Sequence, residues 1–292
     1  MCRCSSNNCR TSIRYNKNSY ANTTAEAVNN NTGEKFPYSL DTEIKVVSEC
    51  TPRHNPEPIE GFTLDYDDNF LMVSQLGPRK NLENSVCWFV EEFIDKEVGL
   101  VLKTNYKNNS ISDFDAISNH LSSLLEKYKD RKCKVYLLHG DLKESQLTWL
   151  YQHEKIKALV NISHGEGFGL PMFEAAREGL PVVTLGWSGQ LDFLHHNGED
   201  FFQAVDYTIQ PIQPQAVWPG VLEKEAMWAF ADQGSYKMVL RRTLKKYGLV
   251  KEKAEKLKKI IETEFNEEKL YADFIDALQF EHAEEEAKVV IL

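Results

Sequence analysis

Residues 163–193 read SHGEGFGLPMFEAAREGLPVVTLGWSGQLDF, and no other stretch of the chain says as much about its architecture. The stretch begins at the end of the apolar run ALVNIS (158–163), passes through a glycine-rich loop into a helical pattern, and contains a second apolar run, PVVTL (181–185). A buried strand, a loop, a helix and another buried strand in this order are typical of a right-handed crossover between parallel strands. The stretch therefore predicts a parallel α/β sheet.

The same alternation of apolar runs and amphipathic segments continues on both sides. Upstream, strands are predicted at 70–75, 99–104 and 134–139, with a helix around 112–128. Short apolar runs without internal alternation suit strands that are buried on both faces. We therefore expect an α/β protein with a Rossmann-like, doubly wound parallel sheet. Helical spacing after residue 220 predicts extra C-terminal helices at 224–231, 235–248, 251–265 and 268–280.

Composition and charge exclude several classes of function. The chain has 292 residues, of which 42% are hydrophobic and 27% charged, as in an ordinary globular protein. The formal net charge of −10 has the wrong sign for a nucleic-acid binder. No apolar run approaches the ~20 residues of a membrane span. The N-terminal residues lack the apolar core of a secretory signal, so we expect a cytoplasmic protein.

Three parts are predicted along the chain. Residues 1–40 are rich in Asn and Ser and poor in large apolar residues, so we expect a flexible arm. Residues 41–280 carry the sheet pattern and form the predicted domain, and residues 281–292 are an acidic tail. The six cysteines are expected to be reduced. No metal site is predicted, because a tetrahedral zinc site would lack one ligand at the first three cysteines, Cys2, Cys4 and Cys9.

The glycine loop contains the residues with the clearest chemical meaning. Gly165, Gly167 and Gly169 allow the backbone to approach a ligand closely, and the helix that follows offers free amides to an anion. Glu166 and Glu174 are separated by seven residues, which places one on the loop and the other about one turn into the helix. Because phosphate repels carboxylates, both are expected to accept hydrogen bonds from the hydroxyls of a sugar or ribose. A tight turn with solvated carboxylates is the alternative that spacing alone leaves open.

A family resemblance narrows this choice. The segment EGFGLPMFEA (166–175), followed by GLPVV (179–183), resembles the E-x7-E motif of retaining GT-B glycosyltransferases of family 4, which include glycogen-synthase-like and sucrose-synthase-like enzymes. SQLGPRKNLENSV (74–86) is similar to the family's first strand and phosphate-binding segment, and KESQLTWLY (143–151) to the helix before its fourth strand. The resemblance covers about residues 44–279, which implies the donor-binding, carboxyl-terminal half of the GT-B fold.

The resemblance also implies roles for particular residues. Glu174 would hold the ribose hydroxyls of a nucleotide sugar, and Glu166 would meet the donor sugar as a catalytic residue. Lys80, also catalytic, would stabilise the leaving nucleoside diphosphate. Family members carry an arginine five residues before this lysine, where this chain has Gln75, and we expect Arg79 to supply the missing charge. The backbone that would meet the donor sugar and its phosphates runs through Gly167, Phe168, Gly169 and Leu170.

Two further loops belong to the predicted site. His139 and Gly140 end a predicted strand at the place where family members run backbone past the nucleotide base. A purely structural role is the alternative for His139. Gly186, Ser188 and Gly189 form the next loop, which we expect to bound the donor sugar, although Ser188 also suits the N-cap of a helix.

The activity implied by the resemblance is transfer of a sugar, most simply a hexose, from a nucleoside-diphosphate sugar to an acceptor with retention of configuration. Such enzymes use no metal and no other cofactor, and the donor phosphate and protein dipoles stabilise the transition state. The nucleotide (UDP, GDP or ADP) and the acceptor (a glycan, lipid or protein) stay open.

The amino-terminal half of a GT-B enzyme, which binds the acceptor, has no counterpart in the sequence, because residues 1–40 stand in its place. A partner chain or a homo-oligomer is therefore expected to supply it. The alternatives are a non-catalytic nucleotide-sugar or carbohydrate-binding module, and a structural or interaction protein that retains the fold. An apolar stripe on the last predicted helix is expected either to fold back on its own domain or to form an interface; it consists of Leu270, Tyr271, Phe274, Ile275 and Leu278.

Overall fold

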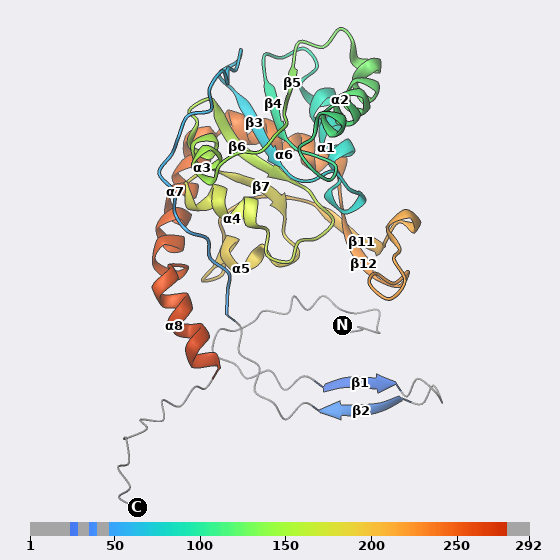
Figure 1. Cartoon of the computed structure of the whole chain (residues 1–292), viewed down its shortest axis with the longest axis vertical. Helices are drawn as coiled ribbons and strands as arrows, with labels where there is room; N and C mark the ends of the chain where they lie inside the picture. The colour runs from blue at the N-terminus through green and yellow to red at the C-terminus, as the bar shows by residue number, and fades with distance from the viewer. Residues whose placement is uncertain (1–23, 29–34, 40–46, 279–292) are drawn as a thin grey trace, which may run out of the picture. The chain divides into compact units, whose positions relative to one another are not determined.

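The computed structural model describes residues 24–28, 35–39 and 47–278. The chain divides into two compact units, of which residues 49–267 are the larger (Figure 1). The other unit comprises residues 1–48 and 268–292.

A six-stranded parallel sheet forms the centre of the larger unit (Figure 1). Its strands, in spatial order, are β10 (Gln203–Val205), β7 (Val182–Leu185), β6 (Ile156–Asn161), β3 (Asn69–Val73), β4 (Gly99–Lys103) and β5 (Lys134–Leu138). All neighbours pair in parallel. The doubly wound sheet predicted from the apolar runs is confirmed. Only β10 was not predicted, because three residues make too short an apolar run to recognise.

Helices cover both faces of this sheet (Figure 1). One layer consists of α1 (Leu82–Phe93), α2 (Ile111–Leu125) and α6 (Gln233–Lys245), and the other of α3 (Glu144–Gln152), α4 (Leu170–Arg177) and α7 (Tyr247–Glu264). Short elements complete the unit: η1 (Pro78–Lys80), η2 (Glu126–Tyr128), α5 (Leu191–Leu194), β8 (His195–His196) and β9 (Glu199–Asp200). The helix predicted around 112–128 corresponds to α2 and η2.

The main hydrophobic core lies between the sheet and the layer of α1, α2 and α6. Phe70 and Met72 of β3 pack there with Phe89 and Val90 of α1, and all four side chains are buried. Burial of each such side chain contributes about 1.5–3 kcal/mol. This packing fixes the position of the strand after which η1 begins.

One of the helices predicted after residue 220 is wrong. Residues 224–231 were expected to be helical, but β12 (Met227–Ala231) is a strand that pairs antiparallel with β11 (Tyr207–Pro211), and η3 (Pro214–Ala216) lies in the connection. Spacing alone does not separate a short apolar helix from a short strand, and the pairing with β11 decided the outcome here. The other three predicted helices correspond to α6, α7 and α8 (Glu267–Ala277).

The smaller unit contains β1 (Thr24–Val28) and β2 (Lys35–Ser39), which pair antiparallel within the predicted arm. The rest of that arm, with Cys2, Cys4 and Cys9, and the tail 281–292 lie outside the described residues. On α8, Leu270 is buried, whereas the other members of the predicted apolar stripe, including Phe274, are exposed.

Candidate functional site

The strand order changes direction between β3 and β6. From β3 the chain continues to β4 and β5 on one side, and it then returns to β6 on the other side of β3. The carboxyl ends of the two strands at such a switch point are where doubly wound proteins bind ligands. The two segments at this point are η1, which follows β3, and the glycine loop, which follows β6.

Arg79 and Lys80 of η1 meet Glu166 of the glycine loop at this switch point. Lys80 Nζ lies 2.7 Å from Oε1 and 2.9 Å from Oε2 of Glu166, and Arg79 Nη1 lies 2.8 Å from Oε2. Arg79 Nη1 also donates to the carbonyl of Gly165. A backbone hydrogen bond of 2.8 Å from His164 N–H to the Arg79 carbonyl joins the two segments directly. Three of the predicted site residues, 86 or 87 positions apart in sequence, are thus brought together.

The Glu166 carboxylate is buried and well satisfied. Only 7% of its side chain is exposed. Ser163 Oγ donates to Oε1 at 2.7 Å, and Asn161 Nδ2 lies 3.4 Å from the same oxygen. Burial acts to raise the pKa of Glu166, but the hydrogen bonds from Lys80, Arg79 and Ser163 outweigh it and hold the pKa below its ordinary value.

The loop after β7 fixes the backbone of Glu166. Ser188 Oγ accepts a hydrogen bond of 3.0 Å from the Glu166 N–H and donates one of 2.6 Å to the Glu166 carbonyl. The N–H of Gly189 donates to the same carbonyl at 3.1 Å. Ser188 adopts a left-handed conformation, with φ of 87°, which a residue with a side chain rarely takes. The first residue of α5 is Leu191, and Ser188 makes no N-cap there.

Aromatic side chains back the start of the glycine loop. The His164 ring stacks on Trp228 of β12 at 5.4 Å and 13°, and its Nδ1 lies 2.8 Å from the Ala229 carbonyl. Trp187 lies against Gly165, where an added Cβ would stand only 2.8 Å from its ring. Burial lowers the pKa of His164, so the imidazole is neutral at pH 7. His164 therefore anchors β12 to the loop.

Glu174 lies on the first turns of α4 and pairs with α3. Its Oε2 accepts a hydrogen bond of 3.0 Å from the hydroxyl of Tyr151, a side chain with 3% exposure. Burial raises the pKa of Glu174, and the Tyr151 hydroxyl partly offsets this effect. Burial also raises the pKa of Tyr151, so that its hydroxyl stays protonated and continues to donate. Tyr151 is a positioning residue for Glu174.

Two other predicted residues are engaged elsewhere. Gln75 is exposed, and its Nε2 donates to the Tyr106 carbonyl at 2.6 Å. His139 Nε2 lies 3.0 Å from Oδ1 of Asp113, and 6% of each of these side chains is exposed. Asp113 also accepts hydrogen bonds from the N–H groups of Tyr106 and Lys107, which hold its pKa well below the ordinary value. This pairing favours the structural alternative for His139, next to Gly140 with its φ of 106°.

The remaining predicted residues form the turn into α4. Gly169 has a φ of 93° and precedes the helix, which carries Pro171 in its first turn. Phe168 turns inward and packs on Phe173 and Phe193 with ring centroids 5.2 and 5.0 Å apart. Only backbone groups of Gly167 and Phe168 thus remain to meet a ligand, whereas Leu170 is 39% exposed.

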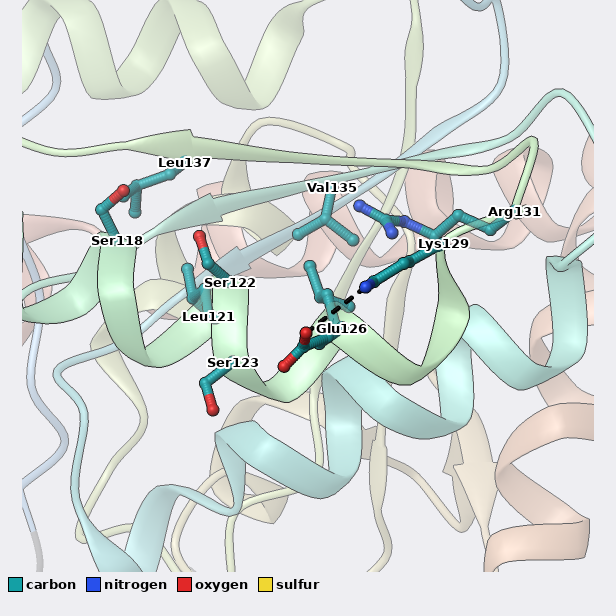
Figure 2. Close-up of a pocket in the computed structure, with 10 residues that line it drawn as sticks. Ser118, Leu121, Ser122, Ser123, Glu126, Lys129, Arg131, Val135 and Leu137 are labelled. Atoms are coloured by element: carbon teal, nitrogen blue, oxygen red, sulfur yellow. Dashed lines mark ion pairs between the residues drawn. The ribbon is translucent and has the colours of Figure 1, made fainter.

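A cavity of about 610 Å³ lies elsewhere, against the edge strand β5 (Figure 2). Leu121 and Ser122 of α2, Val135 and Leu137 of β5, and Arg131 line it (Figure 2). None of the predicted site residues is among its lining residues. The cavity therefore plays no part in the site at η1 and the glycine loop.

Within residues 24–28, 35–39 and 47–278, no group of three or more His, Cys, Asp or Glu side chains is placed to hold a metal ion. In the same described part of the chain, no helix combines the length and the apolar character needed to cross a membrane.

Comparison with known proteins identifies the architecture. No protein-family model matches the chain, and no curated protein sequence matches it. Among solved structures, sucrose-phosphate synthase from Thermosynechococcus elongatus matches with a TM-score of 0.52 and 17% identity, over 76% of this chain and 49% of that one. The apo structure of OtsA matches with a TM-score of 0.51 and 12% identity, over 75% of this chain and 45% of that one. TarM matches with a TM-score of 0.50 and 16% identity, over 82% of this chain and 40% of that one.

The larger unit has the fold of the carboxyl-terminal half of GT-B glycosyltransferases, which confirms the resemblance at the level of the fold. This chain spans less than half the length of each of these three proteins.

Proposed function

We propose that the chain binds a nucleoside-diphosphate sugar and acts in transfer of its sugar, a hexose, to an acceptor with retention of configuration. The observation that carries this proposal is the meeting of Arg79, Lys80 and Glu166 at the switch point between β3 and β6, with Glu174 on the helix that follows. Two cations and the start of α4 suit a diphosphate, and two carboxylates suit hydroxyl groups.

Each residue has a distinct task in this proposal. Lys80 and Arg79 stabilise the negative charge that builds on the diphosphate as the glycosidic bond breaks. Glu166 accepts hydrogen bonds from the donor sugar, and Glu174 accepts them from the ribose. The described residues supply the donor side of the cleft, and this chain spans less than half the length of the three proteins that share its fold. The reaction proceeds without a metal or other cofactor.

Calorimetric titration with UDP, GDP and ADP, each beside its glucose conjugate, tests the donor site. We expect one nucleotide pair to bind with micromolar affinity, Glu174→Ala to weaken it about tenfold, and Lys80→Ala about a hundredfold. Lys129→Ala and Glu126→Ala are matched controls, because these two residues form an exposed ion pair after α2. Absence of binding by the wild-type chain to all six ligands would refute the donor site and favour a structural or interaction protein.

A binding module without turnover is the second candidate. The groups that the described residues bring together are all of the donor-binding kind, which is what such a module requires. Binding of a nucleotide sugar with no release of nucleoside diphosphate, whether or not glycan, lipid or protein acceptors are added, would support the module. Release of the nucleoside diphosphate, together with a product that keeps the anomeric configuration of the donor, would support the transferase. NMR monitors both.

Tyr151→Phe is expected to weaken nucleotide binding several-fold, since Glu174 then loses its buried donor. Loss of the Tyr151 hydroxyl removes an interaction that lowers the pKa of Glu174, so that pKa rises further. Binding that requires the Glu174 carboxylate is lost as pH falls through this pKa, and the loss should begin at higher pH in the variant. Titration over a pH series measures this shift. If the pH dependence of nucleotide binding is the same in Tyr151→Phe and in the wild type, the Tyr151 hydroxyl has no role in ligand binding.

A further inference from the structure

We propose that the Glu166 carboxylate is a fixed internal counter-anion, through which the site prefers an intact nucleotide sugar over the nucleoside diphosphate that transfer leaves behind. This inference rests on the proposed function, because it concerns the ligand that Lys80 and Arg79 hold. It gives Glu166 a role in the choice between two phosphate ligands, in addition to any contact with the donor sugar.

The carboxylate already uses its hydrogen-bonding capacity within the chain. Lys80 contacts both of its oxygens, at 2.7 and 2.9 Å. Arg79 adds a contact of 2.8 Å, and Ser163 one of 2.7 Å. A carboxylate offers about four acceptor positions, and these contacts occupy them until a phosphate draws Lys80 and Arg79 toward itself. Glu166 is therefore part of the resting charge of the site.

The backbone that carries this carboxylate is held by the loop after β7. Ser188 binds both the N–H and the carbonyl of Glu166, and Gly189 adds a second donor to that carbonyl. Ser163 holds the carboxylate itself, through the hydrogen bond to Oε1. The cations are less enclosed: 42% of the Arg79 side chain and 19% of the Lys80 side chain are exposed, against 7% for Glu166. A phosphate from solvent therefore reaches the cations more readily than it reaches the carboxylate.

The charges then favour one ligand over the other. Two cations and one carboxylate leave a single net positive charge at the site. The diphosphate of a nucleotide sugar carries about two negative charges, whereas a free nucleoside diphosphate approaches three at pH 7, because the second pKa of a terminal phosphate is about 6. The additional charge is repelled by Glu166, and the cations that contact Glu166 in the described residues are the same two for both ligands. Partial burial limits the screening of this repulsion by solvent.

The test compares Kd for UDP, GDP and ADP, each with its glucose conjugate, in the wild type and in Glu166→Gln. The amide has nearly the same shape and lacks the charge. We expect the affinity for the nucleoside diphosphate to rise about tenfold, and that for the sugar conjugate to change much less. Glu126→Gln is the matched control, since this exposed carboxylate pairs with Lys129 after α2, and it should leave the ratio of the two affinities unchanged.

An unchanged ratio in Glu166→Gln, with the wild type binding at least one pair, would overturn this inference and leave the donor site intact. Absence of wild-type binding to all six ligands would overturn the donor site and this inference with it. Circular dichroism establishes that the variant is folded. If Glu166→Gln does not fold, Glu166→Asp replaces it, because the shorter side chain draws the charge away from Lys80 by one methylene. The ratio of the two affinities should then shift in the same direction by a smaller factor. An unchanged ratio in Glu166→Asp would also overturn the inference.

Discussion

A Lys80→Met variant is expected to lose about a hundredfold or more in affinity for the nucleoside diphosphate and its sugar conjugate. Lys80 is the cation with two contacts to Glu166, and most of its side chain is enclosed. Removing one partner from a buried ion pair leaves the other charge uncompensated, which costs about 3 kcal/mol of folding stability. Such losses run from about 3 to 5 kcal/mol. Arg79 remains close to Glu166 and partly compensates its charge, so we expect the lower figure.

The stability loss in Lys80→Met should depend on pH in a defined direction. In the wild type the pKa of Glu166 is lowered, so the ionised carboxylate contributes stability that is present above the unfolded value of about 4.5. That contribution disappears as pH falls through the folded pKa. Because Lys80 provides much of it, the deficit of the variant should be largest at neutral pH and should shrink on acidification. Urea unfolding at several pH values measures it.

Lys129→Met provides the comparison, since Lys129 forms an exposed ion pair with Glu126 and should change stability by less than about 1 kcal/mol. A Lys80→Met protein that keeps wild-type stability at neutral pH would contradict the buried pair. One that keeps wild-type nucleotide affinity would contradict the phosphate role of Lys80.

The second large effect is expected from Gly189→Ala. A Cβ at Gly189 would stand 1.6 Å from the carbonyl oxygen of Gly167, and this neighbour is backbone that cannot turn aside. The loop after β7 must then move away from the glycine loop, and the hydrogen bonds from Ser188 and Gly189 to Glu166 are lost. Overpacking of this kind costs about 1–3 kcal/mol. Displacement of the glycine loop, whose backbone is expected to meet the donor sugar and its phosphates, should reduce donor affinity about as strongly as the loss of Lys80.

Gly248→Ala is the matched control for this variant, because it makes the same change at a glycine of α7 that belongs to no predicted site. A Cβ at Gly248 would meet nothing within 4 Å, so donor affinity should stay close to that of the wild type and stability should not fall. Thermal unfolding and calorimetric titration of both variants provide the comparison. Equal behaviour of the two variants would show that the contact between the loops has no role in the site.

The sequence predicted the sheet because each buried parallel strand is an uninterrupted apolar run, which few other structures require. β12 was misassigned because its short apolar segment satisfies helical and strand spacing equally, and its pairing partner is β11, the strand that precedes it in the chain. Such pairing is a tertiary choice that no local pattern contains.

The part of the site that could be predicted from the sequence consists of residues whose type alone indicates a chemical role. The glycines and Glu166 follow β6, and Lys80 follows the neighbouring strand β3. These residues indicated a site at the carboxyl ends of the two strands. The tasks of Ser188 and Tyr151 were not predictable, because a hydroxyl that binds backbone or a buried carboxylate leaves no spacing pattern. The partner of His139 depends on the conformation of the loop that Asp113 holds, which local sequence does not specify.

The tryptophans beside the glycine loop give the protein an optical reporter of its own. Of the five tryptophans in the chain, Trp187 touches Gly165 and Trp228 stacks on His164, so both indole rings adjoin the segment that carries Glu166. Rearrangement of this segment alters the surroundings of these two rings first. Intrinsic emission therefore follows events at the loop without an added dye, and Trp187→Phe and Trp228→Phe assign the signal to one side of the loop or the other.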